Sequence, residues 1–483
     1  MDFLRRSFRW SPRNRSASAA KTPSSSEQTG SSSEGEKREP WCILDFDAKP
    51  DPDPHRCVNV LIVGAGSRGK CYSFFAVHFS KRMKVVGVVE PRTYPREDFQ
   101  NMHSIDQNNV FEDWKEAVER EKFADAVIIT TPDRLHKDPA VAFAKKGYHI
   151  LLEKPMAVTP EDCEEIVSVC KENGVMLAVG HILRYYPVAQ KIKEIIDNGM
   201  IGDVVHIQHM EPVGSWHFAH SFVRGNWRNE KESTFSLLAK SCHDIDLINF
   251  WMGGKRCLKV SSFGHLSHFT KEHKPAGSAS RCLECSVEQT CPYSAKKIYL
   301  TDHAEKGRYG WPVNVVCSNE ECNIENVTEA LKTGPYGRCI YECDNDVVTN
   351  QVVNMEFEGG VTAAFTMMAF TYKMGVRSTT VYGTKGELNC IGRGPVEVHE
   401  FLTAKRSTHP ITMAVCIPSH LMGHAGADYY ILHNFITAVA KNEPSYILTG
   451  PAETLESHLL VFEAEKSRKE NRTIFLENGR EKM

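Results

Sequence analysis

The feature that most constrains this chain is an apolar run that ends in closely spaced glycines. Residues 58–63 read Val-Asn-Val-Leu-Ile-Val, and Gly64, Gly66 and Gly69 follow in the spacing G-x-G-x-x-G. A strand of a parallel sheet is covered on both faces and is therefore almost continuously apolar. Glycines at this spacing permit a tight turn and a close approach of the backbone to a phosphate group. The pattern predicts a buried strand and a phosphate-binding turn, although glycines also recur in ordinary turns.

Strand-like and helix-like segments alternate after the glycines. The helix that starts after Thr159 is well signalled, because Thr159 can cap it, Pro160 suits its first turn, and two acidic residues follow. We expect helices over 68–80 and 138–146 as well, and strands over 83–90, 126–130, 148–152 and 175–179. Such alternation is typical of a parallel, doubly wound α/β sheet, which is the context that a dinucleotide-binding glycine turn requires.

Glu90 ends the second predicted strand. In a dinucleotide site, a carboxylate about 20 residues after the glycines accepts a hydrogen bond from the ribose 2′-hydroxyl and repels a 2′-phosphate. Glu90 therefore favours NAD, while Arg92 and Arg96 nearby leave NADP open. A solvated acid at a strand end is the plainer alternative.

Further motifs lie at the ends of later strands and extend beyond them. They are Thr131-Pro132 with His136, Glu153-Lys154-Pro155, G-H-I-L-R-Y-Y-P over 180–187 and G-M-I-G over 199–202. With the glycine motif, this order resembles the Gfo/Idh/MocA oxidoreductases over residues 57–475, apart from one insertion. The resemblance implies a Rossmann domain over 57–180. It implies, over 181–483, an α+β domain with a large, mostly antiparallel open sheet that can also pair two copies of the chain.

The resemblance also implies roles for residues of the first domain. Lys154 would lie beside the nicotinamide and help to position or protonate the reacting oxygen, which suits a desolvated lysine. The residues expected to contact or frame the cofactor are Gly64, Gly66, Ser67, Arg68, Gly69, Glu90, Thr131, Pro132, His136, Glu153 and Lys154.

A predicted helix over 236–250 resembles the catalytic helix of that family, in which an Asp, a His four residues later and a second Asp three residues after that form the pattern. His243 and Asp246 match the last two positions, but Ala239 replaces the first acid and Lys240 follows it. His243 would accept the substrate proton and Asp246 would orient its imidazole. Lys240 would either lower the pKa of His243 or bind an acidic substrate group. A core histidine and a structural Asp246 are the alternatives.

Several residues are candidates for contact with the substrate. Trp227 and Arg228 lie in a segment that mixes aromatic and hydrogen-bonding side chains, as sugar sites do. His424 belongs to a G-H-x-G-x-D element that resembles a late motif of the family. The expected set is Arg184, Trp227, Arg228, Lys240 and His424. Packed surface loops would explain the same segments.

A cysteine-rich stretch at about 265–346 interrupts the resemblance. Cys282, Cys285 and Cys291 could bind a structural zinc ion if a fourth thiolate came from Cys317, Cys322, Cys339 or Cys343. The spacing is not that of a standard zinc finger, and free or redox-active thiols are the alternative.

Composition limits the remaining possibilities. A net charge of −3 gives no reason to expect nucleic-acid binding, and no run is apolar enough to cross a bilayer. Residues 1–56 form a Ser- and Arg-rich tail and linker that we expect to be disordered. We expect a cytoplasmic protein, with a mitochondrial presequence in the tail as the alternative.

These observations predict an NAD- or NADP-dependent oxidoreductase that transfers a hydride between nicotinamide and a sugar, polyol or related small molecule. One alternative is a redox-neutral NAD-dependent glycosidase. The other is an inactive nucleotide-binding sensor or scaffold, a reading that Ala239 and the long tail favour.

Overall fold

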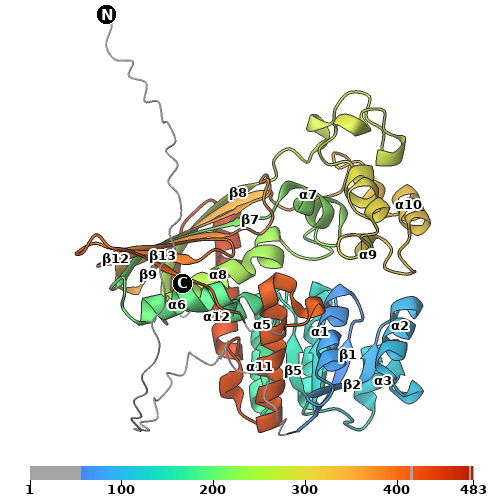
Figure 1. The fold of residues 1–483 in the computed structure, drawn as a ribbon, viewed down its shortest axis with the longest axis horizontal. Coiled ribbons are helices and arrows are strands. Elements are labelled where there is room, and N and C mark those ends of the chain that lie inside the picture. The colour runs from blue at the N-terminus through green and yellow to red at the C-terminus, as the bar shows by residue number, and fades with distance from the viewer. Residues whose placement is uncertain (1–55, 414–416, 478–479, 482–483) are drawn as a thin grey trace, which may run out of the picture. The chain divides into compact units, whose positions relative to one another are not determined.

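The computed structural model describes residues 56–413, 417–477 and 480–481, so the predicted tail and its presequence alternative lie almost wholly outside the described residues. The fold begins with a six-stranded parallel sheet of order β3-β2-β1-β4-β5-β6 (Figure 1). Its strands are β1 (Val58–Val63), β2 (Met83–Val89), β3 (Val110–Phe111), β4 (Ala126–Ile129), β5 (His149–Leu152) and β6 (Leu177–Val179).

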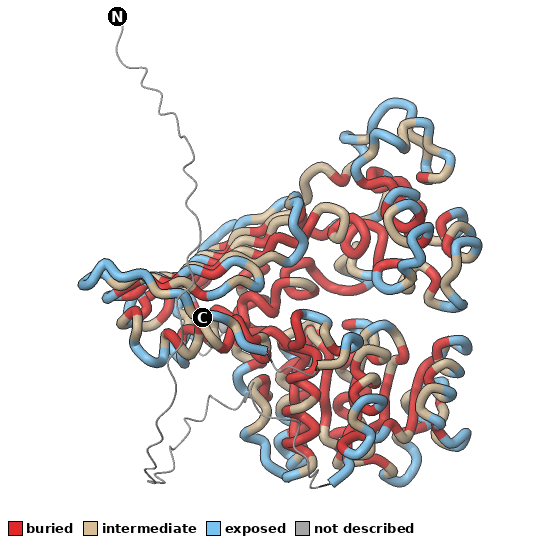
Figure 2. Tube along the Cα trace, viewed as in Figure 1, coloured by how far each residue is buried: buried red, intermediate tan, exposed pale blue. Residues whose placement is uncertain are grey.

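Helices cover both faces of this sheet, because successive side chains of each strand point to opposite faces. From β1, Val60 and Ile62 join a core that includes Tyr72 of α1, whereas Leu61 and Val63 join a second core that includes Phe143 of α4. Figure 2 shows these strands as a buried centre. The helices are α1 (Ser67–His78), α2 (Thr93–His103), α3 (Trp114–Glu119), α4 (Lys137–Lys145) and α5 (Pro160–Glu172).

The predicted doubly wound fold is therefore confirmed, with element ends that differ by one or two residues from those expected. At the start of α5, the Thr159 hydroxyl accepts a hydrogen bond from the Asp162 backbone N–H at 3.2 Å, as the capping pattern predicts.

A mixed, mostly antiparallel sheet of ten strands follows, in the order β14-β13-β12-β11-β7-β10-β9-β8-β15-β16. Only β7 and β10 pair in parallel among its described strands. The bounds are β7 (Val204–Pro212), β8 (Cys257–His265), β9 (Asn350–Phe357), β10 (Thr362–Met368), β11 (Ser378–Gly383), β12 (Gly386–Ile391), β13 (Val396–Glu400), β14 (Arg406–His409), β15 (Ile474–Glu477) and β16 (Arg480–Glu481).

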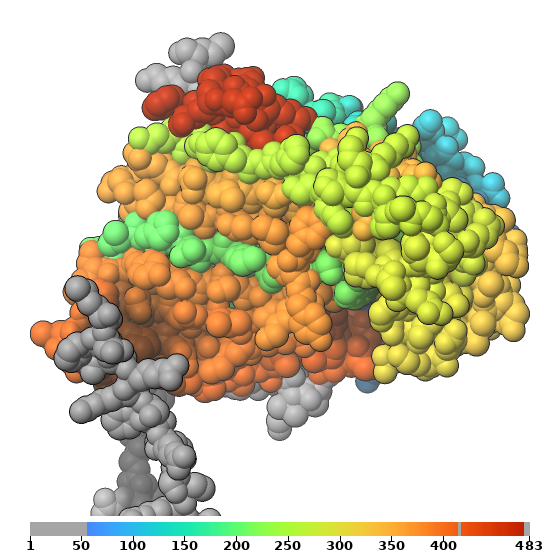
Figure 3. Space-filling model, turned by 90° about the horizontal axis from the view of Figure 1, so that it is seen from above, coloured from blue at the N-terminus to red at the C-terminus, as the bar shows by residue number. Residues whose placement is uncertain are grey.

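One face of the large sheet is covered by helices and the other is open. In β9, Val353, Met355 and Phe357 are buried in the core while Asn354 is exposed. The covering helices include α6 (Pro187–Asp197), α8 (Cys242–Trp251) and α12 (Pro451–Glu470) (Figure 1). Figure 3 looks onto the open face, where the strands lie side by side in the order given. This alternation of buried and exposed residues is what an antiparallel sheet with one solvated face requires.

The cysteine-rich insertion lies between β8 and β9, which are neighbours in the sheet. It carries α9 (Val313–Val316) and α10 (Ile324–Thr333), and it has a small apolar core of its own that includes Tyr299, Val313 and Leu331. The short helix α7 (Ser215–Phe218) lies beside it in Figure 1. In the described part of the chain, no helix combines the length and the apolar character needed to cross a membrane.

Candidate active site

The glycine turn joins β1 to α1 with almost no space to spare. Gly64 has φ +99°, and a Cβ there would lie 2.9 Å from the Thr130 backbone. A Cβ on Gly69 would lie 2.0 Å from the Gly64 carbonyl oxygen. Helix α1 begins at Ser67, directly after Gly66 of the glycine turn. The turn therefore has the glycine requirements of a dinucleotide-binding loop.

Glu90 lies against this turn and is buried. Its Oε2 accepts a hydrogen bond from the Ala65 backbone N–H at 2.9 Å, and Arg92 binds the carboxylate with its Nε at 2.7 Å from Oε1. Burial alone would raise the pKa of Glu90, but hydrogen bonds and the charge of Arg92 hold it below its ordinary value. The carboxylate is therefore ionised where it lies against the glycine turn, with a cation beside it.

Arg68 belongs to an ion-pair network instead of projecting freely from the turn. Its Nε lies 2.7 Å from Glu153 Oε1, and its Nη2 lies 2.8 Å from Oδ1 of Asp428. Tyr72 also donates to Glu153 Oε1, at 2.7 Å. Asp428 lies in the first turn of α11 (Ala427–Lys441) and accepts from His424 Nδ1 at 3.0 Å, so the predicted His424 is joined to the same network. Arg68 and Glu153 thus connect the glycine turn to the loop after β5 and to α11.

The Thr131-Pro132 loop after β4 is held by His136. One ring nitrogen of His136 lies 2.8 Å from the Thr131 carbonyl oxygen and the other 2.7 Å from that of Pro155. Pro132 precedes a short 3-10 turn, and the Thr131 hydroxyl donates to the Leu135 carbonyl at 2.9 Å. His136 therefore braces the two loops that follow β4 and β5 against each other.

Lys154 extends from the loop after β5 to the segment that precedes α8. Its Nζ donates a hydrogen bond to the carbonyl oxygen of Ala239. Ala239 lies in a wide turn, Leu237–Ser241, with π-helical hydrogen bonding, and α8 begins directly after it. The helix predicted over 236–250 therefore consists of two segments, and Lys154 contacts the first of them through the Ala239 carbonyl.

His243 lies on the first turn of α8 and is buried, with no hydrogen-bond partner at Nδ1. Burial lowers the pKa of His243 well below its ordinary value, and the charge of Lys154 lowers it further. The neutral ring can accept a proton near neutral pH. Among the neighbouring charges, that of Lys154 lowers the pKa of His243 most, which corrects the expectation that Lys240 would lower it.

The predicted role of Asp246 in orienting His243 is corrected by its hydrogen-bond partners, which are Arg184 and Ser457. Its two oxygens bind Arg184, with Oδ2 at 2.7 Å from Nε and Oδ1 at 2.9 Å from Nη2, and Ser457 also donates to Oδ1 at 2.8 Å. The side chains of Arg184 and Asp246 are 5% and 1% exposed. The expectation that Arg184 contacts the substrate is corrected as well, because its guanidinium is buried and paired with Asp246.

Lys240, in the wide turn before α8, has a carboxylate partner within the chain. Its Nζ lies 3.4 Å from Oε1 of Glu211, a buried acid at the end of β7. Arg377 completes the group, with Nη2 at 2.9 Å from Glu211 Oε2 and Nε at 2.6 Å from Oδ1 of Asp244. Burial lowers the pKa of Lys240, and Glu211 partly opposes this change.

The expected sugar-binding segment is tied to other parts of the chain. Trp227 Nε1 donates to Asp133 Oδ2 at 2.9 Å, which links it to the loop after β4. Arg228 pairs with Asp344 of the insertion at 2.9 Å and with Glu232 at 2.8 Å. These contacts correct the expectation for Arg228, whose guanidinium has carboxylate partners within the chain.

The three expected zinc ligands Cys282, Cys285 and Cys291 are not gathered into a formed metal site. Among the described residues, one group of three side chains has its ligand atoms within 4.8 Å of one another, and it consists of His181, Cys242 and His458. His458 uses both ring nitrogens, one at 2.7 Å from the Thr454 carbonyl and one at 2.9 Å from the Met156 N–H. In that group, both ring nitrogens of His458 are therefore used in hydrogen bonds within the protein.

Sequence reasoning missed two residues of the site. His181 is buried, its ring centre lies 5.4 Å from that of His243, and its Nδ1 has no hydrogen-bond partner. Its position in the G-H-x-x-R motif was a usable signal. Arg377 lies in a loop with no motif, so only the folded chain reveals its pairing with Glu211 and Asp244.

Comparisons with known proteins match both domains of the fold. The model of the oxidoreductase family with an NAD-binding Rossmann fold matches residues 58–181, and the model of its C-terminal alpha/beta domain matches residues 193–476. An uncharacterized oxidoreductase of Streptococcus pneumoniae is 33% identical over 186 residues, which are 38% of this chain and 48% of that protein. The 2,7-anhydro-N-acetylneuraminate hydratase of Escherichia coli is 30% identical over 214 residues, 44% of this chain and 54% of that protein. The chain thus spans about half the length of these relatives.

Solved structures share the fold. An oxidoreductase from Agrobacterium radiobacter, in complex with NAD+, L-tartaric acid and magnesium, matches with a TM-score of 0.61 at 12% identity over 86% of this chain and 98% of that one. The two family models together cover most of the described residues. The chain therefore belongs to the Gfo/Idh/MocA oxidoreductase family, with an NAD-binding Rossmann domain and the family's C-terminal α/β domain.

Proposed function

We propose that this protein transfers a hydride between a nicotinamide dinucleotide and a CH–OH or C=O carbon of a sugar, polyol or related derivative. The observation that carries the proposal is the meeting of Lys154, from the loop after β5, with the start of the helix that bears the neutral His243. Both lie beyond the carboxyl ends of the parallel strands, where open α/β sheets bind their ligands.

The residues present suit this chemistry. The turn from Gly64 to Gly69 would hold the pyrophosphate and Glu90 the adenosine ribose. A nicotinamide bound there would supply the hydride acceptor for the substrate carbon. His243 takes the hydroxyl proton, and in the reverse direction it returns this proton to the oxygen. The amino group of Lys154 donates a hydrogen bond to the same oxygen and positions it.

A sugar derivative is favoured by the nature of one relative. The Escherichia coli relative is named for its action on an anhydro sugar that carries a carboxylate. In this chain Lys240 and Arg377 form a pair of cations near α8, although Glu211 and Asp244 offset their charge. We propose neutral and acidic sugars and polyols as the first substrates to test.

The test is turnover by the full chain. Purified protein is titrated with NAD+, NADP+, NADH and NADPH by tryptophan fluorescence, and then incubated with a library of sugars, sugar acids and polyols while absorbance of the reduced cofactor is followed. We expect tighter binding of NAD than of NADP because of Glu90. Failure to bind any of the four cofactors would contradict the proposal, and binding without turnover of any substrate would favour a sensor.

Lys154→Met and His243→Asn test the two assigned roles. Each is expected to lower kcat by a factor of about 10² to 10⁴, the range for loss of general acid–base catalysis, while cofactor binding is retained. Lys146→Met and His399→Asn serve as matched controls outside the site and are expected to leave kcat unchanged. Unchanged turnover of Lys154→Met would remove that residue from the mechanism.

A redox-neutral reaction is the second candidate, and the hydratase relative favours it, because addition of water leaves the substrate with no net oxidation. In that case the hydride removed from the substrate would return to the same molecule. The two candidates differ in stoichiometry, since a dehydrogenase accumulates one reduced cofactor per product and a redox-neutral enzyme accumulates none.

We also propose that two copies of the chain associate through the open face of the ten-stranded sheet. Large apolar side chains are exposed on strands of this sheet, among them Val205, Phe263, Ile391 and Phe475. Sedimentation equilibrium of the wild type and of Ile391→Lys tests this, and a monomeric wild type at micromolar concentration would contradict it.

A further inference from the structure

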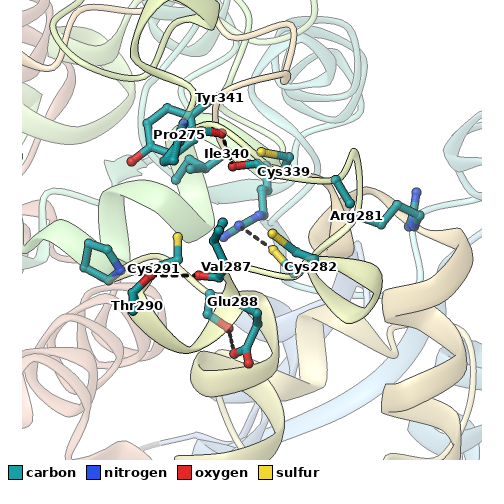
Figure 4. Close-up of a pocket in the computed structure, with 16 residues that line it drawn as sticks. Pro275, Arg281, Cys282, Val287, Glu288, Thr290, Cys291, Cys339, Ile340 and Tyr341 are labelled. Atoms are coloured by element: carbon teal, nitrogen blue, oxygen red, sulfur yellow. Dashed lines mark hydrogen bonds between the residues drawn. The ribbon is translucent and has the colours of Figure 1, made fainter.

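Four cysteines of the insertion line a single pocket away from the candidate active site. Cys282, Cys285, Cys291 and Cys339 contribute to its wall, together with Arg224. Figure 4 labels Cys282, Cys291 and Cys339 among the residues that line it. We call these four the thiol pocket. Cys282 and Cys339 come together because Arg281 and Arg338 form a β-bridge and the Cys339 N–H donates to the Ser280 carbonyl at 2.7 Å.

Arg224 is fully buried in this pocket. Its Nε donates to the Arg338 carbonyl at 2.8 Å, and its Nη2 donates to the Tyr293 carbonyl at 2.9 Å and to Cys282 Sγ at 3.4 Å. Its Nη1 has no hydrogen-bond partner. The guanidinium thus uses only uncharged carbonyl groups and a thiol as acceptors.

No carboxylate is paired with Arg224 in the part of the chain that the structure describes. Glu288 also lines the pocket, but its Oε1 accepts a hydrogen bond from the Ser294 hydroxyl. By contrast, the buried Arg184 donates from Nε and Nη2 to the carboxylate of Asp246. A buried cation without an opposite charge is costly, so the pocket calls for a negative group next to Arg224. Thiolates of the four cysteines can supply that charge.

We propose that Cys282, Cys285, Cys291 and Cys339 form a structural site for one zinc ion, with Arg224 donating to a zinc-bound thiolate. Four thiolates around Zn²⁺ carry a net charge of −2, which Arg224 partly neutralises. Cysteine sulfurs are the ligands that structural zinc prefers, and C-x-x-C is a common pair within such sites. Each thiol gives up its proton to solvent when the metal binds.

The described arrangement must contract to hold the ion, because Zn–S bonds of about 2.3 Å bring the sulfurs closer together than they lie here. Cys282 begins a short 3-10 turn that Cys285 follows, and Cys291 follows another, so the contraction would take place in short turn segments. We take Cys339 as the fourth ligand because it lines the pocket, which Cys343 does not.

Metal analysis of the full chain tests this proposal. Protein without a metal-affinity tag, purified without chelator, is expected to contain about one zinc per chain by mass spectrometry of the elements. Cys291→Ser and Cys339→Ser are expected to lose most of it, whereas Cys343→Ser and Cys317→Ser, from the same insertion, keep it. Replacement of zinc by Co²⁺ is expected to give the intense visible absorption of a tetrahedral cobalt thiolate.

Controls separate metal loss from failure to fold. Cofactor binding by the Rossmann domain reports whether each variant is folded, and removal of zinc from the wild type by a chelator is expected to lower the unfolding temperature. Arg224→Met is expected to weaken zinc retention against a chelator by about tenfold, the range seen for groups that hydrogen-bond to metal ligands. Folded wild-type protein that neither contains nor takes up zinc or cobalt would overturn the proposal, as would iron and sulfide in its place or an anion bound to Arg224 with all four thiols free.

Discussion

The carboxylate of Asp246 is fully engaged by Arg184 and Ser457, and this decides what the residue can do. His243 is left without an acid to stabilise its protonated form, so burial and Lys154 keep the ring neutral. A neutral base that returns its proton readily fits transfer in either direction. At the scale of single residues, His243 and Asp246 lie on the same helix, α8, but Asp246 is paired with Arg184 and not with His243.

Asp246→Asn is expected to destabilise the fold and leave the chemistry in place. Removing one partner of a buried ion pair leaves the other charge unpaired, at a cost of about 3–5 kcal/mol in the free energy of unfolding. Urea unfolding measures this cost, and Asp203→Asn on the surface is the control, expected to change stability by less than about 0.5 kcal/mol. If stability is unchanged and the pH dependence of kcat shifts instead, Asp246 acts on His243 after all.

The turn between β1 and α1 and the wide turn before α8 are the two elements that shape the site. The first depends on glycines because the Gly64 carbonyl packs where a side chain of residue 69 would lie. In the second, Leu237–Ser241, Lys240 pairs with Glu211 and the Ala239 carbonyl accepts a hydrogen bond from Lys154. An ordinary helix through these residues would place Lys240 above His243.

Gly69→Ala is expected to weaken cofactor binding by at least about tenfold, because its Cβ would lie 2.0 Å from the Gly64 carbonyl oxygen and the turn must open to admit it. Fluorescence titration with NAD measures the change. Gly310→Ala is the matched control, since no heavy atom lies within 4 Å of a Cβ there. Equal affinities of the two variants would show that the turn does not hold the cofactor.

At the scale of the whole molecule, C-terminal helices return to the Rossmann domain and complete the site. Asp428 of α11 pairs with Arg68 of α1, and His458 of α12 accepts from the Met156 N–H after β5. The loops that frame the cofactor site are therefore held by residues from the far end of the chain. Several of the groups at this junction are buried neutral histidines.

Stability is expected to fall as the pH is lowered from about 6.5, the ordinary histidine pKa. Burial lowers the pKa of His181 to about 4 and that of His458 to about 3. Between these values and 6.5 the unfolded chain binds protons that the folded chain does not, so each such histidine removes up to about 1.4 kcal/mol per pH unit.

Urea unfolding at pH 7.5, 6.5, 5.5 and 5 measures this dependence. Below about pH 4.5 the paired carboxylates add to the loss, so the comparison stays above it. A free energy of unfolding that is constant from pH 7.5 to pH 5 would contradict burial of neutral histidines at the domain junction.

The sequence by itself determined the doubly wound domain, because apolar strand runs, the Thr159 cap and the spacing from Gly64 to Gly69 are local signals. It also predicted catalytic roles for Lys154 and His243 through motifs of contiguous residues. It could not determine which charges pair, since Arg184 and Asp246, or Arg68 and Asp428, are far apart in the chain and meet only after folding. The tertiary structure decided these partners, the pairing of Lys240 with Glu211 and the isolation of Arg224 among cysteines, because each depends on packing between distant segments.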